Sequence, residues 1–259
     1  ADNIQDLQNF GEFGGVNPSI SDSSTYTFMA AKTMADTFEG NTDGCHLYSR
    51  HTTPSNLCLG EALAAMEGTE TANVSASGMG AITPVLLQLC GAGDHIVSSR
   101  TIYGGTYAFL KNFTPRLAIQ TSFVDITNLE IVEASITENT KVLYCESVSN
   151  PLLEVADIKG LAALAKKHRL TLVVDNTFSP LSISPIQLGA DVVVHSLTKF
   201  INGSSDAVGG VVCGSQEFID QLRSVIDGAC MLLGSTMDSL RASSILKNLR
   251  TLHIRMKQH

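Results

Sequence analysis

Residues 191–200 read DVVVHSLTKF, in which three consecutive valines are followed closely by Ser196, Thr198 and Lys199. A β-branched run without polar alternation is typical of a strand buried on both faces, as in a parallel sheet covered by helices. Lysine is rarely buried unless it is paired. We therefore expect a strand over 191–196, with a lysine directly after it that is either paired or covalently reactive.

The same pattern extends in both directions along the chain. Short β-rich runs predict strands at 71–76, 95–99, 118–125, 141–146, 171–176, 191–196 and 209–214. Helical patterns cover 57–68, 78–90, 105–112, 129–136, 158–168, a short segment after residue 176, and 235–257. This alternation predicts an α/β fold with a mostly parallel seven-stranded sheet flanked by helices. Ligands of such sheets bind beyond the carboxyl ends of the strands.

Three segments are expected along the chain. Residues 1–56 mix Gly, Asn, Ser and Thr without a clear period and predict an extended arm. Residues 57–234 hold the alternating pattern, and 235–259 form one long helical pattern. Because no further core segment follows that helix, we expect it to lead into a C-terminal small domain that is missing from this chain.

Composition disfavours several classes of function. The 259 residues are 44% hydrophobic and 16% charged, with a net charge of −8, which fits a folded protein and argues against nucleic acid or anionic membrane as partners. No stretch is long and apolar enough to span a bilayer. The histidines lack metal-binding spacing, so no metal is expected. Six widely spaced cysteines without C-x-x-C predict free thiols in a reducing, cytoplasmic compartment: Cys45, Cys58, Cys90, Cys145, Cys213 and Cys230.

Three polar clusters follow predicted strands: SASGMG at 75–80, DNT at 175–177 and HSLTK at 195–199. Each alone has an ordinary explanation as a turn, a helix cap or a solvated lysine. Together they supply a lysine that can form a Schiff base, a carboxylate that can keep a ring nitrogen protonated, and a glycine-rich helix start that can bind phosphate. Pyridoxal 5′-phosphate (PLP) requires these three functions of a protein.

Longer stretches point to a family. They are YSRHTTPSN (48–56), ALAAMEGTETANVSASGMGAI (62–82), YGGTY (103–107), ESVSNP (146–151), VVDNTFSP (173–180), GADVVVHSLTKFINGSSD (189–206) and LRTLHIRM (249–256). On these the chain resembles the PLP-dependent enzymes of cysteine and methionine metabolism, such as methionine γ-lyases, cystathionine lyases and synthases, and homoserine sulfhydrylases. The resemblance implies the large domain of the aspartate-aminotransferase-like fold and a sulfur amino acid substrate. It favours γ-elimination of L-methionine to a thiol, 2-oxobutanoate and ammonia.

The resemblance also implies roles for individual residues. Lys199 would hold the cofactor and move protons, Asp175 would pair with the pyridine nitrogen, and Tyr103 would stack on the ring and act near the leaving group. The other implied cofactor-binding residues are Gly78 and Met79 through backbone N–H groups, Ser196 and Thr198 through hydroxyls, Thr177 beside the ring, and Asn150 and Glu146 on the cofactor and substrate side.

A neighbouring subunit is implied as well. Tyr48 and Arg50 would reach the phosphate of a second copy, where a guanidinium can bind in fork geometry. The arm 1–56 would thus complete a neighbour's site in a homodimer or homotetramer. In the family, the C-terminal domain supplies the arginine for the substrate carboxylate, and the sequence shows no counterpart before His259.

Two positions depart from the family pattern. Residues 203–206 read GSSD where relatives often have GHSD, and Gly105 stands where some bacterial methionine γ-lyases have cysteine. The missing histidine is expected to change contacts around the site rather than the Schiff base. The glycine favours plant-like methionine γ-lyases, which YGGT (103–106) and MLLG (231–234) resemble.

Several alternatives stay open at the level of sequence. Methionine elimination, cystathionine lysis and replacement at O-acylhomoserine all fit the same residues. Residues 196–199 also fit the S-x-x-K acylation motif, although its partner motifs S-D-N and K-T-G are absent. GMGAIT at 78–83 is a weak match to a dehydrogenase dinucleotide-binding turn. A chain without the C-terminal domain is also compatible with a non-catalytic scaffold.

Overall fold

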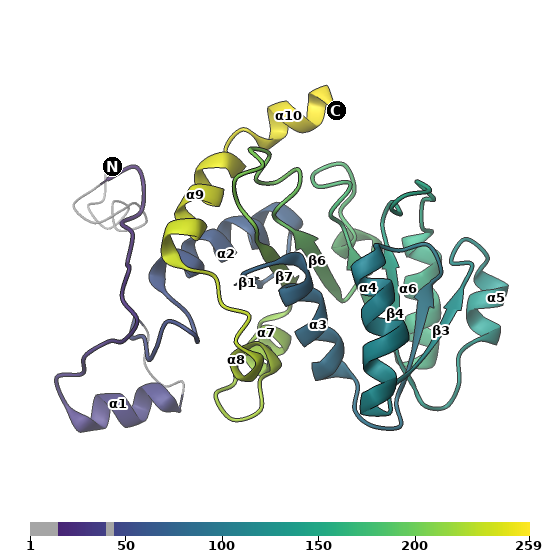
Figure 1. The fold of residues 1–259 in the computed structure, drawn as a ribbon, viewed down its shortest axis with the longest axis horizontal. Helices are drawn as coiled ribbons and strands as arrows, with labels where there is room; N and C mark the ends of the chain where they lie inside the picture. The colour runs from purple at the N-terminus through teal and green to yellow at the C-terminus, as the bar shows by residue number, and fades with distance from the viewer. Residues whose placement is uncertain (1–14, 40–43) are drawn as a thin grey trace.

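The computed structural model describes residues 15–39 and 44–259, and its centre is a seven-stranded sheet with helices on both faces (Figure 1). The strand order is β1-β7-β6-β5-β4-β2-β3. The strands are β1 Thr71–Ser75, β2 His95–Ser99, β3 Gln120–Val124, β4 Thr140–Glu146, β5 Thr171–Asp175, β6 Val192–Ser196 and β7 Gly210–Gly214. The predicted α/β class and strand number are confirmed.

The sheet is parallel except at β7. The neighbouring pairs from β6 to β3 run parallel, whereas β7 is antiparallel to both β6 and β1. Its first residue, Gly210, pairs with Ser75 and Ser196, the last residues of β1 and β6. The connection from β6 to β7 therefore stays at the edge where the parallel strands end.

Helices cover both faces of this sheet. They are α2 Pro54–Glu67, α3 Gly78–Leu89, α4 Gly104–Ala108, α5 Leu129–Ala134, α6 Ile158–His168, α7 Gln216–Arg223, α8 Ala229–Leu233, α9 Ser239–Leu249 and α10 Leu252–Gln258. In β6, Val193 belongs to the apolar cluster on the side of α2, α6 and α9, whereas Val192 and Val194 belong to the cluster on the side of α3 and α7. Burial on both faces explains why this run has no polar alternation.

The C-terminal segment differs from the single helix predicted over 235–257. It forms two helices, α9 and α10, separated at Arg250 and Thr251. The carbonyl of Asn248 accepts from the Thr251 N–H, the Thr251 hydroxyl and the Arg255 guanidinium. These donors replace the usual i→i+4 partner, so the helix turns at this point.

Two other segments also differ from prediction. The helix expected after residue 176 is reduced to a 3₁₀ turn, Ile186–Leu188, because Pro180 and Pro185 prevent a regular helix in this segment. The extended arm contains a helix, α1 Ala31–Phe38, which lies apart from the sheet (Figure 1). The prediction for the first 14 residues and for 40–43 falls outside the described residues.

Candidate functional site

A large cavity lies at the carboxyl ends of the parallel strands and has a volume of about 990 Å³. Every residue nominated from the sequence lines it, except Tyr48 and Arg50. Those that line it are Gly78, Met79, Tyr103, Glu146, Asn150, Asp175, Thr177, Ser196, Thr198 and Lys199. The cavity therefore brings together the three polar clusters that the sequence singled out, at the ends of β1, β5 and β6.

Asp175 is the last residue of β5 and is buried, with 7% of its surface exposed. Burial raises the pKa of its carboxyl group, and hydrogen bonds from Thr177 oppose that rise. The Thr177 N–H and hydroxyl donate to Asp175 Oδ1 at 3.0 and 2.6 Å. The same hydroxyl accepts from the Ser196 N–H at 2.8 Å, so Thr177 connects the ends of β5 and β6.

The glycine-rich turn forms the start of α3, as predicted. Ser77 caps the helix, with its hydroxyl accepting from the Gly80 N–H at 2.9 Å. The N–H groups of Gly78 and Met79 lie in the first turn, where no intrahelical carbonyl can accept from them. A Cβ at position 78 would lie 2.8 Å from the Ser196 Cβ, so only glycine fits between helix and strand. The result is a narrow cradle of N–H donors at a positive helix end.

Lys199 lies in the turn after β6, and its side chain is exposed to the cavity rather than buried. Within the described part of the chain, its ammonium group forms no ion pair. Thr198 differs, because its hydroxyl is held by Gly209: it donates to the carbonyl and accepts from the N–H at 3.3 and 3.1 Å. The described residues supply no carboxylate partner for Lys199, and a reactive amine stays the prediction.

Glu146 ends β4 directly opposite Asp175 on β5. Its carboxylate accepts from the Tyr103 N–H at 2.6 Å and from the Asn150 N–H at 2.9 Å. Burial, and next the neighbouring Asp175 charge, raise the pKa of Glu146 to about 7. Glu146 thereby holds two backbone segments that line the cavity.

Tyr103 precedes α4, and 47% of its surface is exposed. A Cβ at position 105 would lie 2.5 Å from the Tyr103 ring. Glycine at position 105 therefore leaves room for the Tyr103 ring where it lies, whereas the Cβ of a cysteine at this position would displace the ring. This gives the departure noted in the sequence a physical effect on the wall of the cavity.

Helix α10 supplies two residues that sequence reasoning did not nominate. Arg255 and His259 both line the cavity. The Arg255 guanidinium donates to the carbonyls of Phe200 and Ile201, in the turn after Lys199, and the His259 ring contacts Phe200 edge-on. For Arg255 the signal available was the stretch LRTLHIRM at 249–256, and for His259 the sequence offered none.

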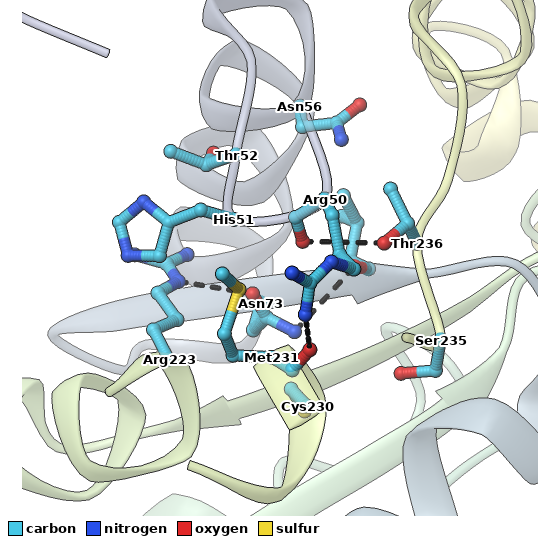
Figure 2. A pocket seen from close by; sticks show the side chains of 11 residues that line it. Arg50, His51, Thr52, Asn56, Asn73, Arg223, Cys230, Met231, Ser235 and Thr236 are labelled. Carbon is cyan, nitrogen blue, oxygen red and sulfur yellow. Dashed lines mark hydrogen bonds between the residues drawn. The ribbon is translucent and has the colours of Figure 1, made fainter. Parts of the chain in front are cut away.

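Tyr48 and Arg50 lie outside this cavity, and Arg50 lines a small polar pocket (Figure 2). Arg50 donates to the Met231 carbonyl at 2.7 Å and lies over the Tyr48 ring at 5.6 Å. Thr236 donates to the Arg50 carbonyl at 3.2 Å, as Figure 2 shows. Neither residue lines the large cavity of its own chain.

The arrangement fits PLP on the structure's own geometry. A buried carboxylate, an unpaired ammonium group and a cradle of backbone N–H groups surround one cavity that is large enough for a cofactor. Each matches one part of the cofactor: the ring nitrogen, the aldehyde and the phosphate. Residues 3–259 match the family described as Cys/Met metabolism PLP-dependent enzyme.

This chain belongs to that family. It is 48% identical over 255 residues to a methionine gamma-lyase of Arabidopsis thaliana, which covers 96% of this chain and 58% of the relative. It is 40% identical over 237 residues to an O-succinylhomoserine sulfhydrylase of Pseudomonas aeruginosa, which covers 91% of this chain and 58% of the relative. Membership of this family excludes the acylation and dehydrogenase alternatives.

Solved structures agree with the fold. A cystathionine gamma-lyase from Lactobacillus plantarum complexed with L-serine superposes with a TM-score of 0.85 at 27% identity, covering 98% of this chain and 65% of that one. A putative O-acetylhomoserine (thiol)-lyase from Campylobacter jejuni, which contains N′-pyridoxyl-lysine-5′-monophosphate, has a TM-score of 0.86 at 29% identity, covering 98% and 72%. The chain spans about 60% of the length of the curated relatives it matches.

Among the described residues, no helix is long and apolar enough to cross a membrane.

Proposed function

We propose that this chain is the PLP-binding part of a carbon–sulfur lyase that eliminates the γ-substituent of L-methionine, giving a thiol, 2-oxobutanoate and ammonia. The observation that carries the proposal is the meeting of Lys199, Asp175 and the Gly78 turn around one cavity. The 48% identity to a methionine gamma-lyase favours this substrate. The 40% identity to an O-succinylhomoserine sulfhydrylase supports, as second candidate, γ-replacement at an O-acylhomoserine. The structural similarity to a cystathionine gamma-lyase, at 27% identity, supports lysis of cystathionine beside it.

The residues would hold the cofactor as follows. The first-turn N–H groups of Gly78 and Met79, with the Ser196 hydroxyl, would bind the phosphate. Asp175 would hold the ring nitrogen, because a buried carboxylate is most stable beside a positive charge. Thr177 keeps the Asp175 carboxylate oriented through two hydrogen bonds to Oδ1. Thr198, whose hydroxyl bonds to Gly209, would act mainly by shaping the turn around Lys199.

When bound, PLP supplies an aldehyde that condenses with an amine and a cationic ring that withdraws electrons from the substrate Cα. The Lys199 amine, freed by the substrate, would remove the proton from Cα and return a proton further along the substrate. Proximity to a cationic ring and loss of water would lower its proton affinity enough for that task. The Tyr103 phenol would donate a proton to the departing sulfur. Its backbone is fixed by the hydrogen bond to Glu146.

The arm would serve a second copy of the chain. Tyr48 and Arg50 lie outside their own cavity, and Figure 1 shows the arm extending away from the sheet. Met29, two residues before α1, and Phe38, the last residue of α1, are 101% and 56% exposed, as expected for a segment that packs on another molecule. We propose a homodimer or homotetramer in which this arm completes a neighbour's phosphate site.

Free cysteines fit a cytoplasmic location.

The deciding experiment is a product assay on the full-length enzyme with methionine, cystathionine and O-acetylhomoserine plus a thiol. Production of 2-oxobutanoate from methionine supports the proposal. Lys199→Ala should lose both turnover and the absorption of lysine-bound cofactor, whereas Lys159→Ala, on the exposed surface of α6, should retain both. Full turnover by Lys199→Ala would refute the assignment. A full-length protein that binds PLP but converts none of the three substrates would favour the scaffold.

A further inference from the structure

A buried polar network lies behind the site, on the opposite face of the sheet. We call it the rear network, and its members are Glu67, Ser147, Asn176, Ser179 and His195. All five are at most 6% exposed. They come from the last turn of α2 and from the ends of β4, β5 and β6.

The rear network alternates with the site residues along the strands. Asn176 directly follows Asp175, and His195 directly precedes Ser196. Because side chains alternate between the faces of a strand, one face presents Asp175 and Ser196 to the cavity and the other presents the rear network to α2. A displacement of the rear network would thus displace the site residues with it.

The centre of the network is a contact between a histidine ring and a carboxyl group. His195 Nε2 lies 2.7 Å from Glu67 Oε1, and the Asn176 side chain donates to the same oxygen at 3.3 Å. Glu67 therefore joins the ends of β5 and β6 through one carboxylate oxygen. Glu67 is the last residue of α2, the helix that follows the arm, so this contact joins the end of α2 to β6.

The network continues toward β4 through hydroxyl groups. Ser179 donates to Asn176 Oδ1 at 2.8 Å. Since that hydroxyl hydrogen is used, Ser147 must donate to Ser179 at the observed 2.8 Å. The ends of β4, β5 and β6 are thereby tied together from behind.

Stability alone is a poor explanation for this pair. Within the described residues, Glu67 Oε2 and His195 Nδ1 are buried without a hydrogen-bond partner. Burying polar atoms without hydrogen-bond partners is costly, so this contact is a weak source of stability. The network lies directly behind the end of β5, which carries Asp175, and the end of β6, which precedes Lys199. This position favours a role in holding the site residues in place.

We infer that Glu67 and His195 are positioning residues for the cofactor site. They hold the ends of β5 and β6 so that Asp175 and Lys199 face one another at the spacing that PLP requires. The inference rests on the proposed function and extends it to a layer of residues that do not touch the cavity.

The test compares Glu67→Gln with Glu61→Gln, an exposed position on the same helix. Glutamine keeps the size and one acceptor oxygen but removes the charge. We expect Glu67→Gln to weaken PLP binding about tenfold, equivalent to about 1.4 kcal/mol, measured by absorbance titration well below the melting temperature. The pH dependence of the bound cofactor's visible absorption should shift as well. Glu61→Gln should bind PLP like the unaltered chain.

Two further variants keep the test decisive. The double variant Glu67→Gln/His195→Gln should lose little more than either single variant, because both act through one contact. Should Glu67→Gln not fold, Ser179→Ala removes the far end of the network with a smaller change and should weaken PLP binding about threefold.

A lower melting temperature with unchanged PLP affinity and unchanged absorption in Glu67→Gln would overturn the inference, since the pair would then be structural only. Unchanged affinity in Ser179→Ala, if it is the variant used, has the same meaning. Failure of the unaltered chain to bind PLP would overturn the proposed function and this inference together. If Lys199→Ala loses PLP and Glu67→Gln binds it with unchanged affinity, the proposed function is supported and this inference is refuted.

Discussion

Replacement of Glu146 by glutamine gives a direct test of the electrostatics of the cavity. Glu146 is 6% exposed and lies opposite Asp175, and its pKa is raised from 4.5 to about 7. The folded chain therefore binds this proton more tightly than the unfolded chain. Stabilisation from the neutral carboxyl is fully present below about pH 4.5 and is lost as the pH rises through about 7.

The size of the effect follows from the rise in pKa. About 1.4 kcal/mol per pH unit, over roughly 2.5 units, amounts to about 3 kcal/mol. In Glu146→Gln the side chain stays neutral, so this loss disappears. The free energy of unfolding of the variant, relative to the unaltered chain, should therefore rise by about 3 kcal/mol between about pH 4.5 and pH 8.

Urea unfolding of the PLP-free chain, followed by circular dichroism at several pH values, measures this difference. Asp175 titrates in both proteins, so its contribution largely cancels. The control is Glu217→Gln, an exposed position in the first turn of α7, whose curve should run parallel to that of the unaltered chain. The reasoning would be refuted if the difference in free energy of unfolding between Glu146→Gln and the unaltered chain changed by less than about 0.5 kcal/mol over this pH range.

Two substitutions test the cofactor-binding roles. Gly78→Ala places a Cβ 2.8 Å from the Ser196 Cβ, so the helix start must move, and PLP affinity measured by absorbance titration should fall at least about tenfold; wild-type affinity would contradict the cradle. Asp175→Asn cannot hold a proton on the ring nitrogen by charge, so turnover by the full-length enzyme should fall by about 100-fold or more while the cofactor still absorbs as a lysine adduct; unchanged turnover would remove Asp175 from its role.

Much of the fold and site followed from local sequence. The valine run at 192–194 predicted a strand buried on both faces, and the polar clusters after three strands predicted where the cavity lies. These inferences succeeded because the carboxyl ends of parallel strands lie at one edge of the sheet. Residues that directly follow such strands are therefore placed at that edge by their position in the sequence. The nominations of Asp175 and Lys199 needed no knowledge of distant contacts.

Features that depend on distant contacts were not predicted. Glu67 reads as an ordinary residue near a helix end, and its pairing with His195 arises only when α2 packs on the sheet. The division of 235–257 into two helices depends on Arg255 reaching the carbonyl of Asn248. The helix at 31–38 is amphipathic, but its pattern spans only eight residues of the arm, and apolar residues such as Met34 and Phe38 are exposed.

The reversed direction of β7 has a consequence for how relatives can diverge. Because β7 starts beside the end of β6, the connection between them stays at the edge of the sheet where the cavity lies, and Gly203, Ser205, Asp206 and Val208 form part of the cavity wall. Changes in length or chemistry within this connection alter what the cavity accepts, while every ladder partner of the two strands stays in place. A single antiparallel strand thus lets substrate preference evolve separately from the folding core, and the GSSD at 203–206 lies in the segment with that freedom.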